Sequence, residues 1–152
     1  MNDKAPDQFV DASIENGLEL CENFYKNRFH IRYSQSRPTQ LRWPKFVTRM
    51  DCSGLVSNVF WRLGVGKHIA WESQNTWSLI QLGKAVPGAK IKPLDVVFYG
   101  PAKDDPHHVA IYIGGGKVLS NGHYPMGKYP IDYRSDRIGI RRFADLPEST
   151  QV

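Results

Sequence analysis

The sequence predicts an α+β fold in which N-terminal helices pack on a mainly antiparallel sheet. Apolar residues recur at helical spacing in the first half of the chain, and the second half holds short runs rich in β-branched and aromatic residues. Helices followed by strands are typical of α+β proteins. The length of 152 residues, with 41% hydrophobic and 23% charged side chains, predicts one globular domain over residues 1–152.

The first predicted element is an amphipathic helix over residues 8–28. Its apolar stripe consists of Val10, Ile14, Leu18, Cys21, Phe24 and Tyr25. Because Cys21 belongs to this stripe, we expect it to be a small buried hydrophobe. From Ile31 to Met50 prolines interrupt polar residues, which indicates an irregular loop of about twenty residues, a length that is often functional.

A second helix is predicted to begin at Cys52. Asp51 before it is a good N-cap, and Gly64 fits its C-terminal end. The buried face would consist of Leu55, Val56, Val59, Phe60 and Leu63. A third, shorter helix is expected over residues 73–83, where it also ends at a glycine.

Strands are predicted over residues 94–99, 108–113, 117–121 and 137–143. The glycines at positions 114–116 supply a tight turn between the second and third of these strands. Strand alternation places His108, Ala110 and Tyr112 on one face. The aliphatic residues between them would face the core, so His108 would open onto the opposite side.

Cys52 is the predicted nucleophile. A thiol reacts as thiolate, and its ordinary pKa of about 8.5 leaves little thiolate at neutral pH. The unpaired N–H groups at a helix start favour an anion, and a nearby histidine can take the proton. His108 is the predicted general base, whereas His107 is expected to be a loop histidine.

A catalytic imidazole needs a polar partner that fixes its tautomer. If Gly114 and Gly115 form a two-residue turn, Asn121 lies opposite His108 at about 5 Å. A turn at Gly115 and Gly116 would instead place His123 there. We expect Asn121 to be the third catalytic residue because an amide needs no particular protonation state; His123 and then Ser120 are the alternatives.

Three motifs together resemble the NlpC-type cell-wall cysteine peptidases. They are Asp-Cys-Ser-Gly-Leu-Val at 51–56, Pro-Leu-Asp-Val-Val-Phe-Tyr at 93–99 and His-Val-Ala-Ile-Tyr-Ile-Gly at 108–114. Their order and spacing fit the family, and the resemblance spans roughly Tyr33 to Arg142. It implies a papain-like fold and a Cys-His-polar triad that hydrolyses peptide stems of bacterial peptidoglycan through a thioester, with no metal or organic cofactor.

The same resemblance implies roles for three further residues. Tyr33 matches a tyrosine that lines the oxyanion hole or substrate cleft. Asp51 and Ser53 resemble residues that hold the amino end of the stem peptide. In many relatives the third triad member is a histidine, whereas the matching stretch here is Ser-Asn-Gly-His at 120–123.

The net charge of +5 and pI near 9.3 predict attraction to a polyanion. Zinc-finger spacing and RNP motifs are absent and the basic residues are scattered, so we expect no nucleic-acid partner. No Cys-x-x-Cys or His-x-x-x-His pair suggests a metal site. Charge alone does not choose between an anionic membrane and an anionic cell wall; the family resemblance implies the cell wall as the partner.

The N-terminal residues lack the apolar core of a signal peptide, and no stretch approaches the ~18 apolar residues of a membrane span. We therefore expect cytoplasmic synthesis, no stable membrane insertion and a monomer. A lone, basic catalytic domain resembles a phage endolysin or a tail-associated lytic protein that reaches the wall after phage-mediated release. An amidase or acyltransferase on the same scaffold, and a non-catalytic wall-binding or tail structural protein, are the alternatives.

Overall fold

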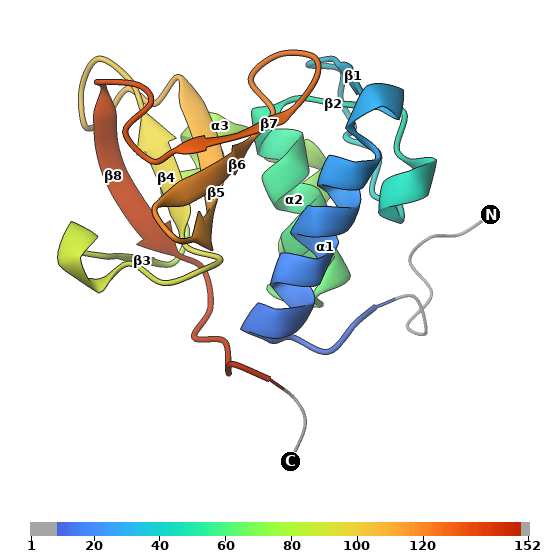
Figure 1. Cartoon of the computed structure of the whole chain (residues 1–152), viewed down its shortest axis with the longest axis horizontal. Coiled ribbons are helices and arrows are strands. Elements are labelled where there is room, and N and C mark those ends of the chain that lie inside the picture. Colours follow the sequence, from blue (N-terminus) through green and yellow to red (C-terminus); the bar gives the residue numbers. More distant parts are fainter. Residues whose placement is uncertain (1–8, 150–152) are drawn as a thin grey trace.

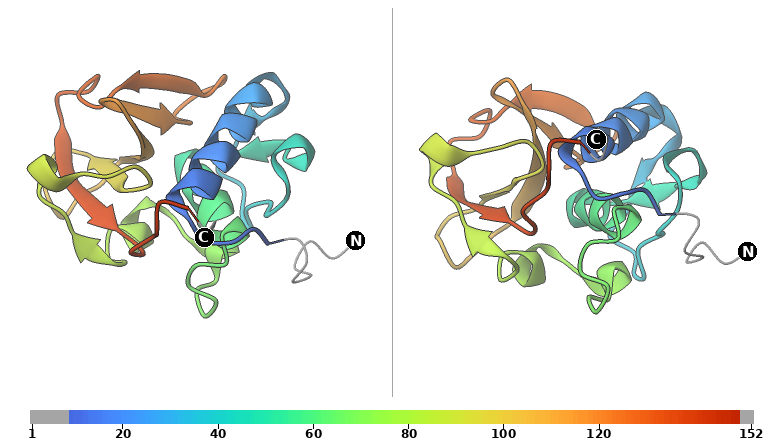
Figure 2. Two further views of the ribbon diagram at one scale, coloured as in Figure 1. Left: turned by 60° about the horizontal axis from the view of Figure 1, so that its bottom comes forward. Right: turned by 90° about the horizontal axis from the view of Figure 1, so that it is seen from below.

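The structure is a computed structural model that describes residues 9–149. Two helices lie side by side and pack against one side of a curved sheet (Figures 1 and 2). The helices are α1 (Ile14–Lys26) and α2 (Cys52–Arg62). The sheet has six strands, and each neighbouring pair in it is antiparallel. The predicted α+β class is confirmed.

Helix α1 begins later than predicted. The Ser13 side chain accepts a hydrogen bond from the Asn16 N–H at 3.0 Å, so Ser13 is the N-cap. Residues 9–13 have no helical structure, which makes the predicted start wrong, and residue 8 lies outside the described residues. Val10 instead donates its N–H to the Arg62 carbonyl. Cys21 is buried on the apolar stripe, as predicted.

Helix α2 agrees with the prediction. Asp51 caps it by accepting the Gly54 N–H at 2.8 Å, and Gly64 follows its end with a φ of 70°. Each residue from Cys52 to Arg62 is buried, so α2 is an interior helix. Its first turn therefore has a fixed position in the molecule.

The third predicted helix is shorter than expected. Trp71–Ser73 form a 3-10 helix, and α3 covers only Thr76–Leu79. Gln74 between them has extended backbone, and Asn75 starts α3 by accepting the Ser78 N–H. Further 3-10 helices are Arg28–His30, Pro44–Phe46 and Gly88–Lys90.

The sheet contains the four predicted strands and two that were not predicted. Its order is β3-β8-β4-β5-β6-β7. The bounds are Lys84–Ala85 for β3, Val96–Tyr99 for β4, His108–Gly114 for β5, Lys117–Ser120 for β6, Gly127–Pro130 for β7 and Arg137–Arg142 for β8. A separate parallel pair, β1 (Arg32–Tyr33) and β2 (Arg49–Met50), brackets the predicted loop.

The register of the β5–β6 hairpin differs from both predicted alternatives. Gly114 pairs with Lys117, but Tyr112 pairs with Val118, so one extra residue on β5 forms a bulge. When this register is continued, Gly122 falls opposite His108. Neither Asn121 nor His123 takes that place, because neither predicted turn included a bulge.

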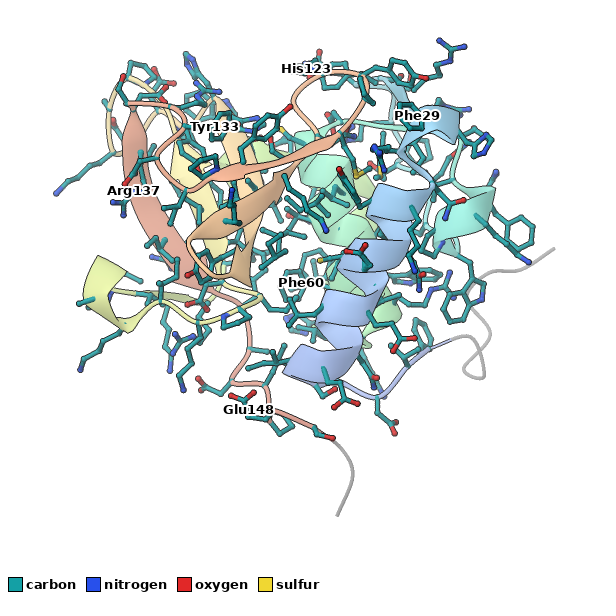
Figure 3. The ribbon with its side chains drawn as sticks, viewed as in Figure 1. Phe29, Phe60, His123, Tyr133, Arg137 and Glu148 are labelled. Carbon is teal, nitrogen blue, oxygen red and sulfur yellow. The ribbon has the colours of Figure 1, made fainter. Side chains whose placement is uncertain are left out.

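The central strands β4, β5 and β6 are largely buried on both faces. Val109 and Ile111 pack with the helices in the main core, where Phe60 of α2 also lies (Figure 3). Ala110 lies on the other face in a second apolar cluster with Val97 and Tyr99. The expected open side around His108 is therefore wrong, since the His108 side chain is only 4% exposed. In residues 9–149 no helix is long and apolar enough to cross a membrane.

Candidate active site

Cys52 lies at the wall of a pocket of about 440 Å³. The pocket is formed by the start of α2, the segment around β1 and the segments before α3 and β5. Its lining includes Tyr33, Arg37, Asp51, Ser53, Thr76, Trp77 and His107. The structure thus brings all three predicted substrate-binding residues to the predicted nucleophile.

The Cys52 thiol is buried but lies among hydrogen-bond donors. Burial and the negative charge of Asp51 raise its pKa above the ordinary value, while hydrogen bonds from the Val109 backbone, the Thr76 side chain and the Ser53 backbone oppose this effect. Thr76 Oγ1 lies 3.8 Å from the sulfur. Because the Cys52 pKa remains raised on balance, formation of its thiolate requires a base that removes the proton.

His108 is the first residue of strand β5. It follows His107, which lines the pocket, and precedes Val109, whose backbone contacts the Cys52 thiol. Burial, and to a smaller extent the positive charge of Arg134, lower the pKa of His108 from 6.5 to about 4. The ring is therefore neutral at pH 7, the form in which one of its nitrogens carries no proton. Within residues 9–149 no direct thiol–imidazole hydrogen bond is formed; such bonds in ligand-free enzymes are often long.

Ser120, rather than Asn121, contacts the His108 ring. Ser120 Oγ lies 2.7 Å from His108 Nε2, and the Tyr133 hydroxyl lies 3.1 Å from Ser120 Oγ. The bulge in β5 causes this outcome, because it shifts the register so that Ser120 is the diagonal neighbour of His108. The predicted Asn121–His108 hydrogen bond is wrong.

Asn121 has a different place in the site. Its side chain is fully buried, and its amide N–H donates to the Met50 carbonyl at 3.0 Å and to the Asp51 carbonyl at 3.4 Å. It therefore connects the end of β6 to the segment that enters α2. His123 lies on the exposed loop after β6 (Figure 3), where Nδ1 contacts the Tyr124 carbonyl.

Gly122 packs against the edge of the His108 ring. A Cβ at position 122 would lie 2.9 Å from His108 Cε1, which is closer than real Cβ contacts allow. Only glycine therefore leaves room for the imidazole in this position. Gly122 could be identified as the neighbour of His108 only once the register of β5 and β6 was known.

Asp51 and Ser53 have an unexpected partner in Arg37. Arg37 Nη2 donates to both carboxylate oxygens of Asp51, at 3.0 and 3.2 Å, and to Ser53 Oγ at 2.8 Å. Sequence reasoning placed Arg37 in an irregular loop and gave it no role. Tyr33 lies in the same pocket, with its hydroxyl accepting a hydrogen bond from Gln35 at 3.3 Å.

Thr76 and Trp77 are also pocket residues that the sequence did not single out. They are the first two residues of α3, whose start at the Asn75 cap was not predicted. The Trp77 ring is 53% exposed at the pocket. In the part of the chain from 9 to 149, no cluster of His, Cys, Asp and Glu side chains could hold a metal ion.

Two curated proteins match just under half of this chain. Peptidoglycan endopeptidase RipA of Mycobacterium tuberculosis is 39% identical over 69 residues, which are 45% of this chain and 13% of RipA. Peptidoglycan endopeptidase RipB of the same species is 41% identical over 69 residues, 45% of this chain and 26% of RipB. The match thus spans about a quarter or less of these relatives.

Solved structures match over more of the chain. The peptidoglycan hydrolase RipB structure has a TM-score of 0.62 at 21% identity and covers 87% of this chain and 67% of that chain. RipD of M. tuberculosis, described as a non-catalytic NlpC/p60 domain protein, has a TM-score of 0.60 at 16% identity and covers 84% and 98%. The NlpC/P60 family model matches residues 20–129, which include the start of α2, strand β5 and the β5–β6 hairpin. The chain therefore belongs to the NlpC/P60 family.

Proposed function

We propose that this protein hydrolyses amide bonds in the peptide stems of bacterial peptidoglycan, with Cys52 as nucleophile. The observation that carries this proposal is the position of Cys52 at the first turn of α2, in a pocket wall and beside backbone and hydroxyl hydrogen-bond donors. RipA and RipB, which are named peptidoglycan endopeptidases, support the substrate class.

His108 acts as general base in the proposed reaction. It removes the Cys52 proton, and the thiolate attacks the scissile carbonyl to give a tetrahedral oxyanion. Backbone N–H groups at the start of α2, which have no intrahelical acceptor, stabilise that oxyanion together with Tyr33. His108 then protonates the leaving amine, and water hydrolyses the thioester.

Ser120 takes the orienting role in this mechanism. In the tautomer with the proton on Nε2, Ser120 Oγ accepts that hydrogen bond and Nδ1 is left as the base. Tyr133 in turn contacts Ser120, so the orienting group is itself held in place. The ring edge against Gly122 restricts rotation of the imidazole.

The site of action is part of the same proposal. The net charge of +5 favours encounter with an anionic wall. We propose that the protein acts as a monomer on the wall from outside the cytoplasm, as an endolysin or a tail-associated lytic protein. Clearing of intact bacterial cells by the purified protein would test the bacteriolytic part separately.

A second candidate is non-catalytic wall binding. The fold relative RipD, described as non-catalytic, favours it as the alternative. An amidase or acyltransferase is a third, since an amine can resolve a thioester as water does.

One digestion separates these functions. Purified peptidoglycan is incubated with the protein, new free amines are measured, and the fragments are identified by mass spectrometry. Hydrolysis within the stem peptide gives a new amine and a new carboxylate for each cut. Acyl transfer gives cross-linked products without net amine release, and a binding protein gives sedimentation with the wall and no fragments. The last two results would each overturn the proposal.

A further inference from the structure

Arg37 occupies the part of the pocket formed by Asp51 and Ser53. The resemblance to cell-wall peptidases implies that these two side chains hold a substrate ammonium group. In this chain the Arg37 guanidinium already contacts both. The charge that would attract an ammonium is therefore paired within the protein.

The side-chain oxygens of Asp51 and Ser53 already accept hydrogen bonds from groups within the protein. Asp51 Oδ1 accepts from the Gly54 N–H, the Ser53 hydroxyl and Arg37, while Oδ2 accepts from Arg37 at 3.0 Å. Asp51 is 6% exposed and Ser53 is 1% exposed. A substrate ammonium would find few open lone pairs here and would lie next to a guanidinium of the same charge.

Arg37 is fixed in this position from several sides. Its Nε donates to the Gln74 carbonyl at 3.1 Å, and its Nη1 donates to the Gln35 and Ser36 carbonyls at 3.2 Å. Every guanidinium nitrogen thus has an acceptor. Moving Arg37 away would break these bonds and leave the Asp51 carboxylate buried without its cation, which is costly.

We propose that Arg37 determines specificity by closing this subsite to a free N-terminal ammonium, so that the protein takes stem peptides whose N-terminus is acylated. A neutral amide has no charge to be repelled and needs no carboxylate. Stem peptides still joined to a glycan through their N-terminus belong to this class, and released peptides with a free amine do not. The inference rests on the proposed function for its substrate.

The test uses one stem peptide in two forms, L-Ala-γ-D-Glu-diaminopimelate-D-Ala with a free α-amine and the same peptide N-acetylated. Wild-type kcat/KM at pH 7 should favour the acetylated form by about tenfold or more, a difference of about 1.4 kcal/mol. At pH 9.5 the α-amine, with a pKa near 8, is largely neutral, so the preference should shrink severalfold. Equal rates, or faster cleavage of the free amine at pH 7, would overturn the inference.

Two arginine variants separate the Arg37 contact from general charge. Arg37→Met should reduce the preference to about twofold or less, because Asp51 is then available to an ammonium. Arg49→Met removes an exposed arginine of β2 and should leave the preference unchanged. If Arg37→Met does not fold, the wild-type pH comparison decides. An Arg37→Met protein that folds and keeps the full preference contradicts the inference.

Binding distinguishes failure of this inference from failure of the proposed function. Cys52→Ala protein is titrated with each peptide by calorimetry. Tighter binding of the acetylated form supports the Arg37 role even where the wild type cuts neither peptide, a result that would reject only the peptidase proposal. Equal binding, tighter binding of the free amine, or binding of neither form rejects the Arg37 role.

Discussion

Cys21 and Cys52 are almost equally buried, at 3% and 7% exposure, yet they lie in different chemical surroundings. Cys21 is in the middle of α1, in the apolar core, where burial raises its pKa to about 12. Cys52 is at the first residue of α2, where N–H and hydroxyl groups oppose the effect of burial. Burial alone therefore does not separate a structural thiol from a reactive one; the hydrogen-bond donors around the sulfur do.

Replacing each cysteine by alanine should give the largest contrast. We expect Cys52→Ala to lower peptidoglycan hydrolysis by about 10³-fold or more, because the nucleophile is lost. Cys21→Ala should keep activity within about twofold and lower the free energy of unfolding by roughly 1–2 kcal/mol, since it leaves a small cavity. Amine release and urea unfolding measure the two effects. A Cys52→Ala protein with wild-type activity would remove the nucleophile assignment.

Alkylation compares the two thiols in the native protein. Iodoacetamide should modify Cys52 at least about tenfold faster than Cys21, because the Cys52 sulfur borders a pocket and its thiolate has donors. Peptide mass spectrometry over time gives both rates. In urea the two rates should converge. Equal rates in the folded protein would show that the surroundings of Cys52 do not favour its thiolate.

Ser120 and Asn121 offer a second pair of neighbours with different expected effects. Ser120→Ala should lower kcat by about tenfold to 100-fold while stability changes little, because the imidazole loses its orienting contact. Asn121→Ala should lower the free energy of unfolding by roughly 1–3 kcal/mol, because the Met50 and Asp51 carbonyls each lose one of their two hydrogen bonds. Kinetics and urea unfolding on both variants test this. A larger kcat loss for Asn121→Ala at unchanged stability would return the orienting role to Asn121.

The pH dependence of stability tests the burial of the neutral His108 ring. The pKa of His108 is about 4 in the folded chain against 6.5 when unperturbed. Between these values the unfolded chain binds more protons, so the free energy of unfolding falls as the pH falls from 6.5 to 4. His108→Gln should reduce the loss between pH 7 and pH 4.5 by about 2 kcal/mol. His123→Gln, at an exposed position, is the control, and an identical pH profile for His108→Gln and wild type would contradict the buried neutral ring.

The sequence was informative where local signals act and less so where chain segments meet. The Asp51 cap, the apolar face of α2 and the aliphatic face of β5 are local patterns, and all three were predicted correctly. The contact of His108 with Ser120 depends on a β-bulge. One extra residue of β5 beside the glycine-rich turn forms this bulge and shifts the register. Arg37 reaches Asp51 only because the loop before α2 folds back, and no periodicity encodes that path.

The fully buried Asn121 amide links the sheet to the helical layer. Cys52 belongs to the helical layer and His108 to the sheet, so their mutual alignment depends on how the two layers slide past each other. The Asn121 side chain joins the end of β6 to the carbonyls of Met50 and Asp51, directly before Cys52. Sliding of one layer over the other would stretch these two hydrogen bonds. The Asn121 side chain thus restrains the position of Cys52 relative to the sheet that carries His108.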